Sequence, residues 1–323
     1  MIYRHEIKAF NEFWLDCDTE MLFSILVSKD EKYRILAYRN DYYYTYLGAY
    51  TPSRVYFEEM RSMPDIADLR EKVFHYIDKR RGKDVSENIE YIKTYLKEGY
   101  YVLAGVDLYE WVEENMCYHN HHVEHYALLN GYDDEKNVFY TMETDNEKYR
   151  EFQVGEQKLS EAMELAETLQ FQVVAFCIKD ELSNQPLYTW KELRKNAKRI
   201  VHSIRPLLSK SFWLFTPKDY QNLFYRDMTV MYLMQINCRM KANCLLFAYL
   251  EEKEGLDGEF KEKAEQLENG WIDVRRTISK LYFKNDANAR MQEQNEKING
   301  LLREEREMWK KFISDAKQQR RQI

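Results

Sequence analysis

The spacing of apolar residues along the sequence changes near residue 185, and this change limits the folds that the chain can adopt. Before it, short apolar runs of strand type alternate with amphipathic helical segments. After it, the stretches 188–210, 217–254 and 258–318 all carry the spacing of helices. The turn-forming sequence Asn184-Gln185-Pro186 separates the two parts. The pattern therefore predicts an α+β domain over 1–185, followed by an all-helical domain over 186–323.

Alternation and helical spacing place the individual elements of the first domain. We expect helices over 17–28, 67–82, 86–98 and 156–169, and strands over 33–50, 100–109, 125–132, 137–144 and 170–179. The polar residues 133–136 lie between two of these strands and are typical of a hairpin turn.

The helical domain carries few residues suited to chemistry, and this points to a supporting role. We expect Pro206 and Pro217 to break or kink its helices, because proline lacks the amide donor. The long apolar spacing of 258–318 indicates helical hairpins or a partial coiled coil. We interpret the domain as a lid, a docking platform for a partner, or an arm through which the protein forms a homodimer.

The charge balance bears on partners and location. The formal net charge is -7, from 48 basic and 55 acidic residues, whereas nucleic-acid binders more often have a basic excess. The same balance disfavours an anionic membrane as a partner. The first residues are charged, and no run reaches the ~20 apolar residues that span a membrane. We therefore expect a cytoplasmic protein that binds neither nucleic acid nor membrane.

The cysteines and histidines are arranged in a way that disfavours metal and disulfide frameworks. The five cysteines are scattered without a CxxC motif, so we expect neither a disulfide framework nor a zinc site. Four histidines crowd the stretch 119–125, but His121 and His122 are adjacent and would point to opposite sides of a strand. We expect no metal and no cofactor, and interpret each cysteine as core packing or a reactive thiol.

One combination of residues is suited to nucleophilic catalysis. Cys17 opens an apolar helix, where amide donors and the positive end of the helix dipole lower the pKa of a thiol. His125 opens a strand and is the candidate base. An acid after the next turn, Glu143 or Asp145, would fix the orientation of the imidazole. On spacing alone, the preferred interpretation of Cys17 is a small apolar residue on the buried helix face. Cys117 is a rival nucleophile in an irregular stretch.

Further residues near the expected site are candidates for binding substrate. Asp107 ends a strand and carries the charge to bind a substrate amine, although polar residues commonly end strands. Tyr109 and Trp111 are candidates for the wall of a cleft, with core packing as the alternative. His122 lies in a polar loop that we expect at the mouth of the site.

A longer stretch resembles a known family. The sequence GYYVLAGVDLYEW…HHVEHYALLNGYDDEKNVFYTMETD over 99–145 resembles the N-terminal family of butirosin biosynthesis protein H. It is also similar to the papain-like peptidases that process double-glycine bacteriocin leaders. Both groups have a histidine that opens an apolar strand ending in Gly-Tyr-Asp, here His125 and Gly131-Tyr132-Asp133. The resemblance covers about 180 residues and implies a papain-like fold for 1–185.

The resemblance also implies roles for individual residues. His125 matches the catalytic histidine, and Asp16-Cys17 matches the Asp-Cys pair that precedes the nucleophile helix. Glu143 falls where the relatives usually have Asp, and Asp18 replaces the usual Gly after the nucleophile. Asn11 stands six positions before Cys17, where papain-like enzymes carry the oxyanion-hole Gln.

Three functions follow from these expectations. The resemblance implies a cysteine-dependent acyltransferase that moves an acyl group from a carrier-protein thioester to a small amine, in antibiotic or other specialised-metabolite biosynthesis. A papain-like peptidase acting on a peptide substrate is the alternative, because the same site hydrolyses peptides when water is the acceptor. The replacements at positions 18 and 143 also allow a non-catalytic binding protein on a degenerate papain-like fold.

Overall fold

The computed structural model describes most of the chain as two compact units. It describes residues 1–13, 17–46, 55–59, 73–145, 147–169, 172–179, 186–209, 223–282 and 288–319. The first unit comprises Met1–Glu12, Asp16–Tyr33 and Ala67–Gln185. The second comprises Phe13–Leu15, Arg34–Ile66 and Pro186–Ile323. The molecule is thus an antiparallel sheet unit joined to a largely helical unit.

A seven-stranded sheet forms the centre of the first unit. Its strands are β1 (Ile2–Arg4), β4 (Phe74–Arg81), β5 (Tyr101–Asp107), β6 (Glu124–Asp133), β7 (Val138–Thr144), β8 (Tyr149–Gly155) and β9 (Gln172–Ile178). Their order is β4-β9-β5-β6-β7-β8, and β1 pairs with the end of the long strand β6. All described pairings are antiparallel. The predicted strands over 100–109, 125–132, 137–144 and 170–179 are therefore confirmed.

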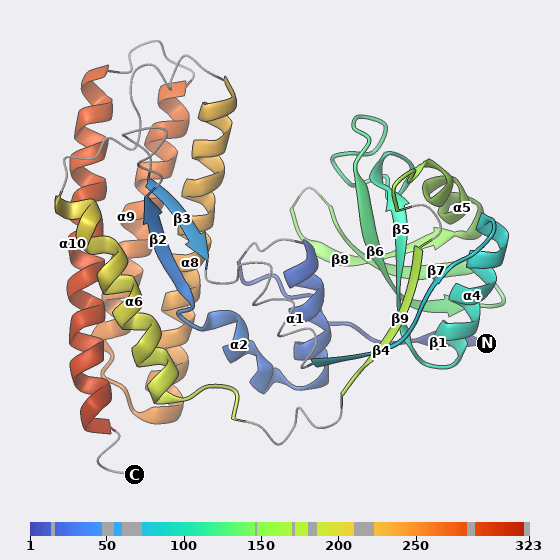
Figure 1. Ribbon diagram of the computed structural model, residues 1–323, viewed down its shortest axis with the longest axis horizontal. Coiled ribbons are helices and arrows are strands. Elements are labelled where there is room, and N and C mark those ends of the chain that lie inside the picture. The colour runs from blue at the N-terminus through green and yellow to red at the C-terminus, as the bar shows by residue number, and fades with distance from the viewer. Residues whose placement is uncertain are drawn as a thin grey trace. The chain divides into compact units, whose positions relative to one another are not determined.

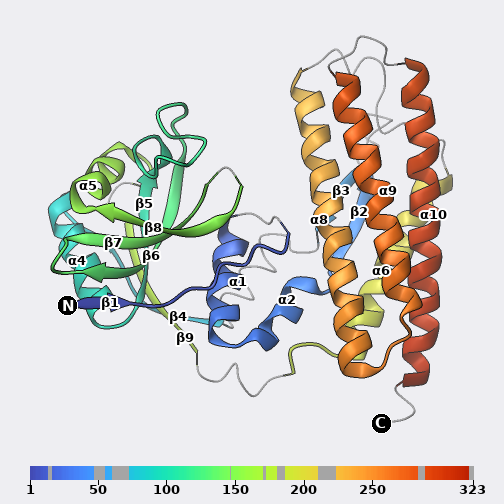
Figure 2. The ribbon, with the colours of Figure 1, turned by 180° about the vertical axis from the view of Figure 1, so that it is seen from behind.

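Helices lie on both sides of this sheet. The amphipathic helices α4 (Val85–Lys97) and α5 (Glu156–Leu165) contact each other and cover one face. Asp84 caps α4, because its side chain accepts a hydrogen bond from the amide of Glu87. Helix α1 (Cys17–Lys29) lies on the other side of the sheet (Figures 1 and 2). The helices predicted over 17–28, 86–98 and 156–169 are present.

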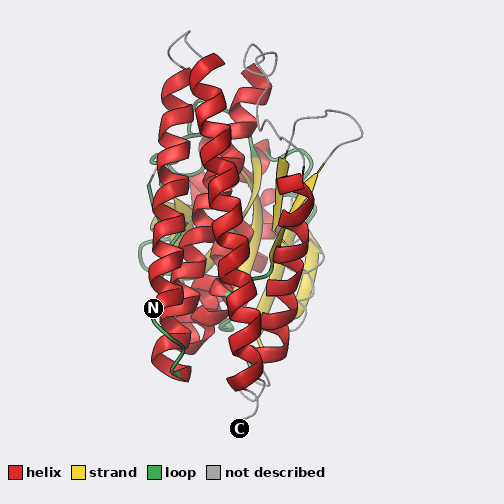
Figure 3. Ribbon diagram, turned by 90° about the vertical axis from the view of Figure 1, so that its left-hand side faces the viewer, coloured by secondary structure: helices red, strands yellow, loops and turns green. Residues whose placement is uncertain are grey.

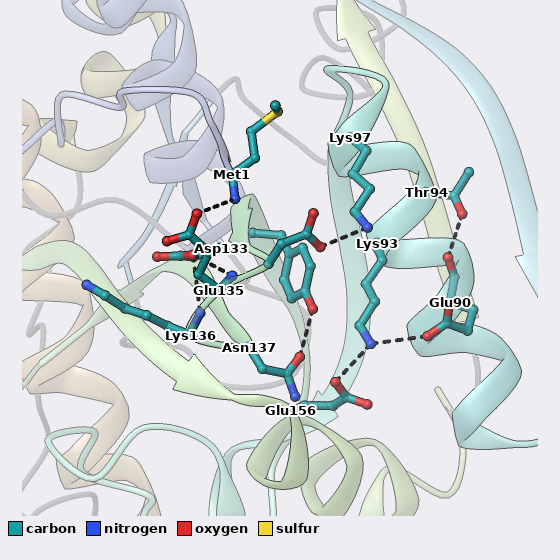
Figure 4. A network of polar contacts seen from close by, with 12 residues as sticks. Met1, Glu90, Lys93, Thr94, Lys97, Asp133, Glu135, Lys136, Asn137 and Glu156 are labelled. Carbon is teal, nitrogen blue, oxygen red and sulfur yellow. Dashed lines mark hydrogen bonds and ion pairs between the residues drawn. The ribbon is translucent and has the colours of Figure 1, made fainter.

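Polar contacts fix the β6–β7 hairpin, whose turn follows Asp133. The carboxylate of Asp133 accepts hydrogen bonds from the backbone amides of Glu135 and Lys136 inside the turn (Figure 4). Lys97 of α4 forms an ion pair with Asp134 at 2.8 Å. The short side chain of an Asp can accept a hydrogen bond from the amide two residues on, so Asp133 favours a turn here. The hairpin predicted at 133–136 is confirmed.

The second unit consists of long helices and a short hairpin. Its helices are α2 (Arg34–Tyr38), α6 (Trp190–Ser209), α8 (Leu223–Glu254), α9 (Glu259–Tyr282) and α10 (Asn288–Gln319), and its hairpin joins β2 (Tyr42–Tyr46) to β3 (Val55–Glu59). Helices α8, α9, α10 and α6 run side by side in contacting pairs (Figure 3). The stretch predicted over 258–318 is two helices, as a helical hairpin requires. Pro206 lies inside α6 without ending it, and Pro217 lies outside the described residues.

The helical unit is not built from residues after 185 alone, which corrects the predicted division at that position. Residues 34–46 belong to it, and among their side chains Tyr38, Tyr42 and Tyr44 are buried. The guanidinium of Arg239 on α8 donates to the carbonyl oxygens of Ala37 at 3.1 Å and Arg39 at 2.9 Å. The side chain of Asn40 donates to the carbonyl oxygen of Leu193 on α6 at 2.9 Å. The all-helical prediction also missed the β2–β3 hairpin.

Two further predictions were wrong in the first half of the chain. Residues 67–82 were expected to be helical; residues 67–72 lie outside the described part of the chain, and Phe74–Arg81 is β4, an edge strand paired with β9. Most of the side chains of β4 are exposed, so no alternation marks it as a strand. Residues 33–50 were expected to be one strand, but Arg34–Tyr38 is a short helix before β2. No helix in the described part of the chain is apolar over a length that would cross a membrane.

Candidate functional site

His125 and Glu143 lie together at one end of the sheet. His125 stands on β6 and Glu143 on the neighbouring strand β7. The imidazole Nε2 lies 3.6 Å from the carboxylate Oε2 of Glu143. The His125 side chain is 19% exposed and the Glu143 side chain 2%. The fold therefore brings His125 and Glu143 into contact, as the sequence predicts.

Both side chains point to the face of the sheet that α4 and α5 cover. Successive residues of a strand alternate between faces. Ala127 and Leu129 belong to the buried cluster on that face, so His125 shares their side of β6. Phe139 belongs to the same cluster, so Glu143 shares its side of β7. The imidazole and the carboxylate thus lie at the rim of the apolar core between the sheet and its two helices.

Burial dominates the electrostatics of Glu143. Loss of solvent raises the pKa of this carboxyl, and the nearby His125 acts in the opposite direction. One oxygen, Oε1, accepts a hydrogen bond from the amide of Thr144 at 2.8 Å. The other, Oε2, is buried and has no hydrogen-bond partner among the described residues. A protonated imidazole beside it would supply the missing partner and stabilise the negative charge.

The second candidate acid has a different role. The carboxylate of Asp145 accepts hydrogen bonds from the amides of Glu147 at 2.8 Å and Lys148 at 2.7 Å. It also accepts from Nε of Arg150 at 2.6 Å. These bonds lower the pKa of Asp145 and hold it inside the β7–β8 turn. Of the two acids, Glu143 is the one beside His125.

Cys17 is the first residue of α1, and its side chain is exposed. The amides of Lys8 and Phe10 donate to the hydroxyls of Ser28 at 2.6 Å and Ser24 at 2.9 Å, so the N-terminal segment runs antiparallel to α1. Among the contacts of the described residues, no hydrogen bond joins Cys17 to His125 or to Glu143. The structure therefore brings the base and the acid together, with the helix thiol on a separate element.

Asn11 forms a two-way link to the sheet. Its side-chain amide donates to the carbonyl oxygen of Tyr149, and its side-chain oxygen accepts from the amide of Tyr149, both at 2.9 Å. Tyr149 opens β8 and pairs with Thr144, the neighbour of Glu143. Asn11 therefore fixes the N-terminal segment to the end of the sheet that carries the site. Both halves of its amide are engaged in this contact.

The three residues predicted to bind substrate form one cluster. The carboxylate of Asp107 is 3% exposed and lies 2.9 Å from Nδ1 of His122. Its other oxygen accepts from the amides of Tyr109 at 2.9 Å and Val123 at 3.1 Å. The rings of Tyr109 and His122 stack with centroids 4.2 Å apart. Asp107 thus anchors the loop after β5, and His122 presents the exposed edge of the cluster.

Replacing Asp107 with Ala removes the acceptor for these two amides and for the imidazole. We expect the free energy of unfolding of the sheet unit to fall by about 2–3 kcal/mol, because two part-buried amides and the imidazole of His122 lose their acceptor. Urea denaturation followed by circular dichroism measures the change. Glu113→Ala is the matched control, since that side chain is 72% exposed in its pair with Lys158. Equal stability of the two variants would contradict the anchoring role.

Two further residues, Asn115 and Cys117, lie near the His125–Glu143 pair, and the sequence patterns did not predict this position. The side-chain amide of Asn115 donates to the carbonyl oxygen of Thr144 at 3.2 Å, and its oxygen accepts from the amide of Cys117 at 2.9 Å. The second bond is an Asx turn, which an Asn two positions before its partner can form. Cys117 is half-buried and packs against the apolar cluster. The sequence Asn115-Met116-Cys117 is compatible with this Asx turn and could have indicated it.

The histidines between 119 and 125 bind different partners. His119 lies 3.1 Å from the carboxylate of Glu110 and stacks on Tyr118, whereas His122 and His125 contact Asp107 and Glu143. Within the described ranges, no group of three metal-ligating side chains is arranged to hold a metal ion. No protein-family model matches the sequence. No curated protein matches it either.

Proposed function

We propose that the protein is a cysteine-dependent acyltransferase on a papain-like fold, in which His125 accepts the proton of a thiol and Glu143 orients the imidazole. The acyl donor is a carrier-protein thioester and the acceptor a small amine. A cytoplasmic location and a place in specialised-metabolite biosynthesis belong to the same proposal. The observation that carries it is the 3.6 Å contact between His125 and the buried Glu143.

The environment of the pair supports acid–base chemistry. A buried carboxylate oxygen without a hydrogen bond stabilises an imidazolium more strongly than the neutral ring. Deprotonation of a thiol by His125 creates that imidazolium. The gain therefore appears only after proton transfer, as a base in catalysis requires. An isolated surface histidine would lack this stabilisation of its protonated form.

In the proposed reaction the nucleophile is a cysteine thiol, and Cys17 is the candidate that the sequence predicts. Its thiolate attacks the thioester carbonyl, and the carbon–sulfur bond to the donor thiol breaks as the imidazolium returns its proton. An amine then attacks the carbonyl carbon of the acyl-cysteine, the carbon–sulfur bond breaks, and the amide product leaves. The proton lost by the amine passes through His125 to the cysteine sulfur. The Cys17 amide is the oxyanion donor. In this proposal, Asn11 acts as a second donor only when its side-chain amide leaves the carbonyl oxygen of Tyr149 and donates to the oxyanion instead.

His125→Ala should lower the rate of acyl transfer about 100-fold or more, because the thiol loses its base. The measurement follows conversion of an acyl N-acetylcysteamine thioester and a primary amine to the amide by mass spectrometry. His75→Ala is the matched control, since His75 is an exposed histidine on β4 of the same sheet. Equal loss in both variants, or no turnover by the wild-type protein with thioester or peptide, would refute the enzymatic proposal.

The same experiment separates the alternative functions. A peptidase releases the free acid and cleaves peptides, so hydrolysis would exceed amide formation at high amine concentration. A non-catalytic binding protein forms neither product and leaves both substrates unchanged. Intact-protein mass after a short reaction tests the acyl-enzyme directly. An adduct absent from Cys17→Ser identifies that thiol as the nucleophile.

A further inference from the structure

The His125–Glu143 pair has a thiol on its own face of the sheet. Strand β6 lies between β5 and β7, so the residues at one end of these strands are neighbours. On β5, Val106 pairs with His125, and Asp107 is the next residue. Glu143 contacts His125 from β7, the strand on the other side of β6 from β5. A group that approaches both Asp107 and Glu143 must therefore lie close to the start of β6.

Cys117 is such a group. Its amide and the carbonyl oxygen of Thr144 bind the same side-chain amide of Asn115, which places Cys117 one short link from Glu143. The charges of Glu143 and Asp107 both raise the pKa of the Cys117 thiol, after burial as the largest cause. The thiol also packs against the apolar cluster that contains Val106, the partner of His125. The backbone hydrogen bonds, the effect of the two charges and the packing all place Cys117 near the start of β6.

We propose that Cys117 is the thiol served by His125 and Glu143, and that it takes up the acyl group at this site. The inference rests on the proposed acyl-transfer function and replaces the helix thiol by one in the loop after β5. Glu143 provides an independent sign of a reacting group, because its Oε2 is buried without a hydrogen bond among the described residues. The contact with Nε2 of His125 is 3.6 Å long, and it strengthens when the thiol proton gives the ring a positive charge.

The chemistry balances without a further reagent. Nε2 of His125 faces Glu143, so Nδ1 is the ring nitrogen that receives the thiol proton. The Cys117 sulfur forms a bond to the thioester carbonyl carbon, the carbon–sulfur bond of the donor breaks, and the donor thiolate takes the proton from the imidazolium. The products are an acyl-Cys117 thioester and a free thiol. Since burial and two carboxylates keep the resting thiol protonated, attack depends on the base.

The test uses the full chain and two probes. An acetyl N-acetylcysteamine thioester reports acylation, and iodoacetamide reports thiol reactivity, with the modified residue mapped by peptide mass spectrometry. We expect both probes to modify Cys117 near neutral pH, and His125→Ala to slow both reactions about tenfold or more. Cys177→Ser is the matched control, because Cys177 is another half-buried thiol of the same sheet. Its loss should leave the labelling unchanged, whereas Cys117→Ser abolishes it.

Each outcome bears on a separate statement. Acylation of Cys17, with Cys117 unmodified and with dependence on His125, overturns this inference and leaves the proposed function standing. Alkylation of Cys117 that depends on His125, without acylation by the thioester, supports the thiol site and contradicts acyl transfer. Slow labelling spread over all five cysteines overturns both. Melting temperatures of the variants show that each remains folded, and His125→Gln repeats the measurement in a side chain of similar size.

Discussion

Replacing Glu305 with Ala should lower the free energy of unfolding of the helical unit by about 4 kcal/mol, through two lost hydrogen bonds and a cavity. Glu305 lies on α10 and is fully buried. Its carboxylate accepts hydrogen bonds from the hydroxyls of Tyr42 at 2.5 Å and Tyr44 at 2.6 Å. Both tyrosines are buried on β2, so the variant leaves their hydroxyls without this acceptor.

The control for this prediction is the neighbouring residue of the same type. Glu304 is 51% exposed and forms a surface ion pair with Lys263 at 2.7 Å. Glu304→Ala should change the free energy of unfolding by less than about 1 kcal/mol, because exposed ion pairs contribute little. Urea denaturation followed by circular dichroism measures both variants. Similar values for the two would show that the buried contacts contribute no more than the surface pair.

The pH dependence of stability should carry the signature of the same carboxyl. Burial raises the pKa of Glu305 from 4.5 to about 7, while the bonds from Tyr42, Tyr44 and Trp309 act in the opposite direction. The folded state thus favours the protonated acid more than the unfolded state does. Its stabilising contribution is complete below pH 4.5, decreases as the pH rises to about 7, and is constant above that. The total loss is about 3 kcal/mol, at about 1.4 kcal/mol for each unit of pKa difference.

The amide variant Glu305→Gln isolates this effect from the titration of other groups. Glutamine stays neutral at every pH, so the difference in stability between the wild-type protein and the variant should follow Glu305 alone. We expect that difference to change by about 3 kcal/mol in disfavour of the wild-type protein between pH 4.5 and 7. Urea midpoints across this range provide the measurement. Parallel curves for the two proteins would mean that Glu305 titrates at its ordinary pKa.

Local patterns predicted the elements whose side chains alternate in burial or repeat with helical spacing. Helix α4 has apolar residues on one face and a capping Asp84, and the β6–β7 hairpin has its polar turn, so both were found. Strand β4 was missed because its neighbour β9 determines its conformation and its own side chains are largely exposed. The short helix α2 was missed because five residues are too few for a repeat.

The candidate site also contains one contact that local patterns predicted and one that they did not. Strand patterns predicted that His125 and Glu143 would meet, because they lie at matching ends of a hairpin. The position of Cys117 depends on a loop held by the side chain of Asn115, and no periodicity describes such a contact. Likewise, the buried tyrosines of β2 find their partner on α10, more than 250 residues later. Contacts between distant segments of this kind lie beyond local patterns.

The chain contributes Phe13–Leu15 and Arg34–Ile66 to the helical unit, returns to the sheet unit at Ala67, and enters the helical unit again at Pro186. Tyr42 therefore leaves the ribosome long before Glu305, the residue whose carboxylate its hydroxyl binds. The helical core cannot close during synthesis until the sheet unit and most of α10 have been made. For the same reason, a gene fragment that ends at residue 185 would encode the whole sheet unit together with an incomplete piece of the helical unit, and a fragment that begins at residue 186 would lack residues 34–66 of the helical unit. The two parts therefore cannot be exchanged between proteins as separate cassettes.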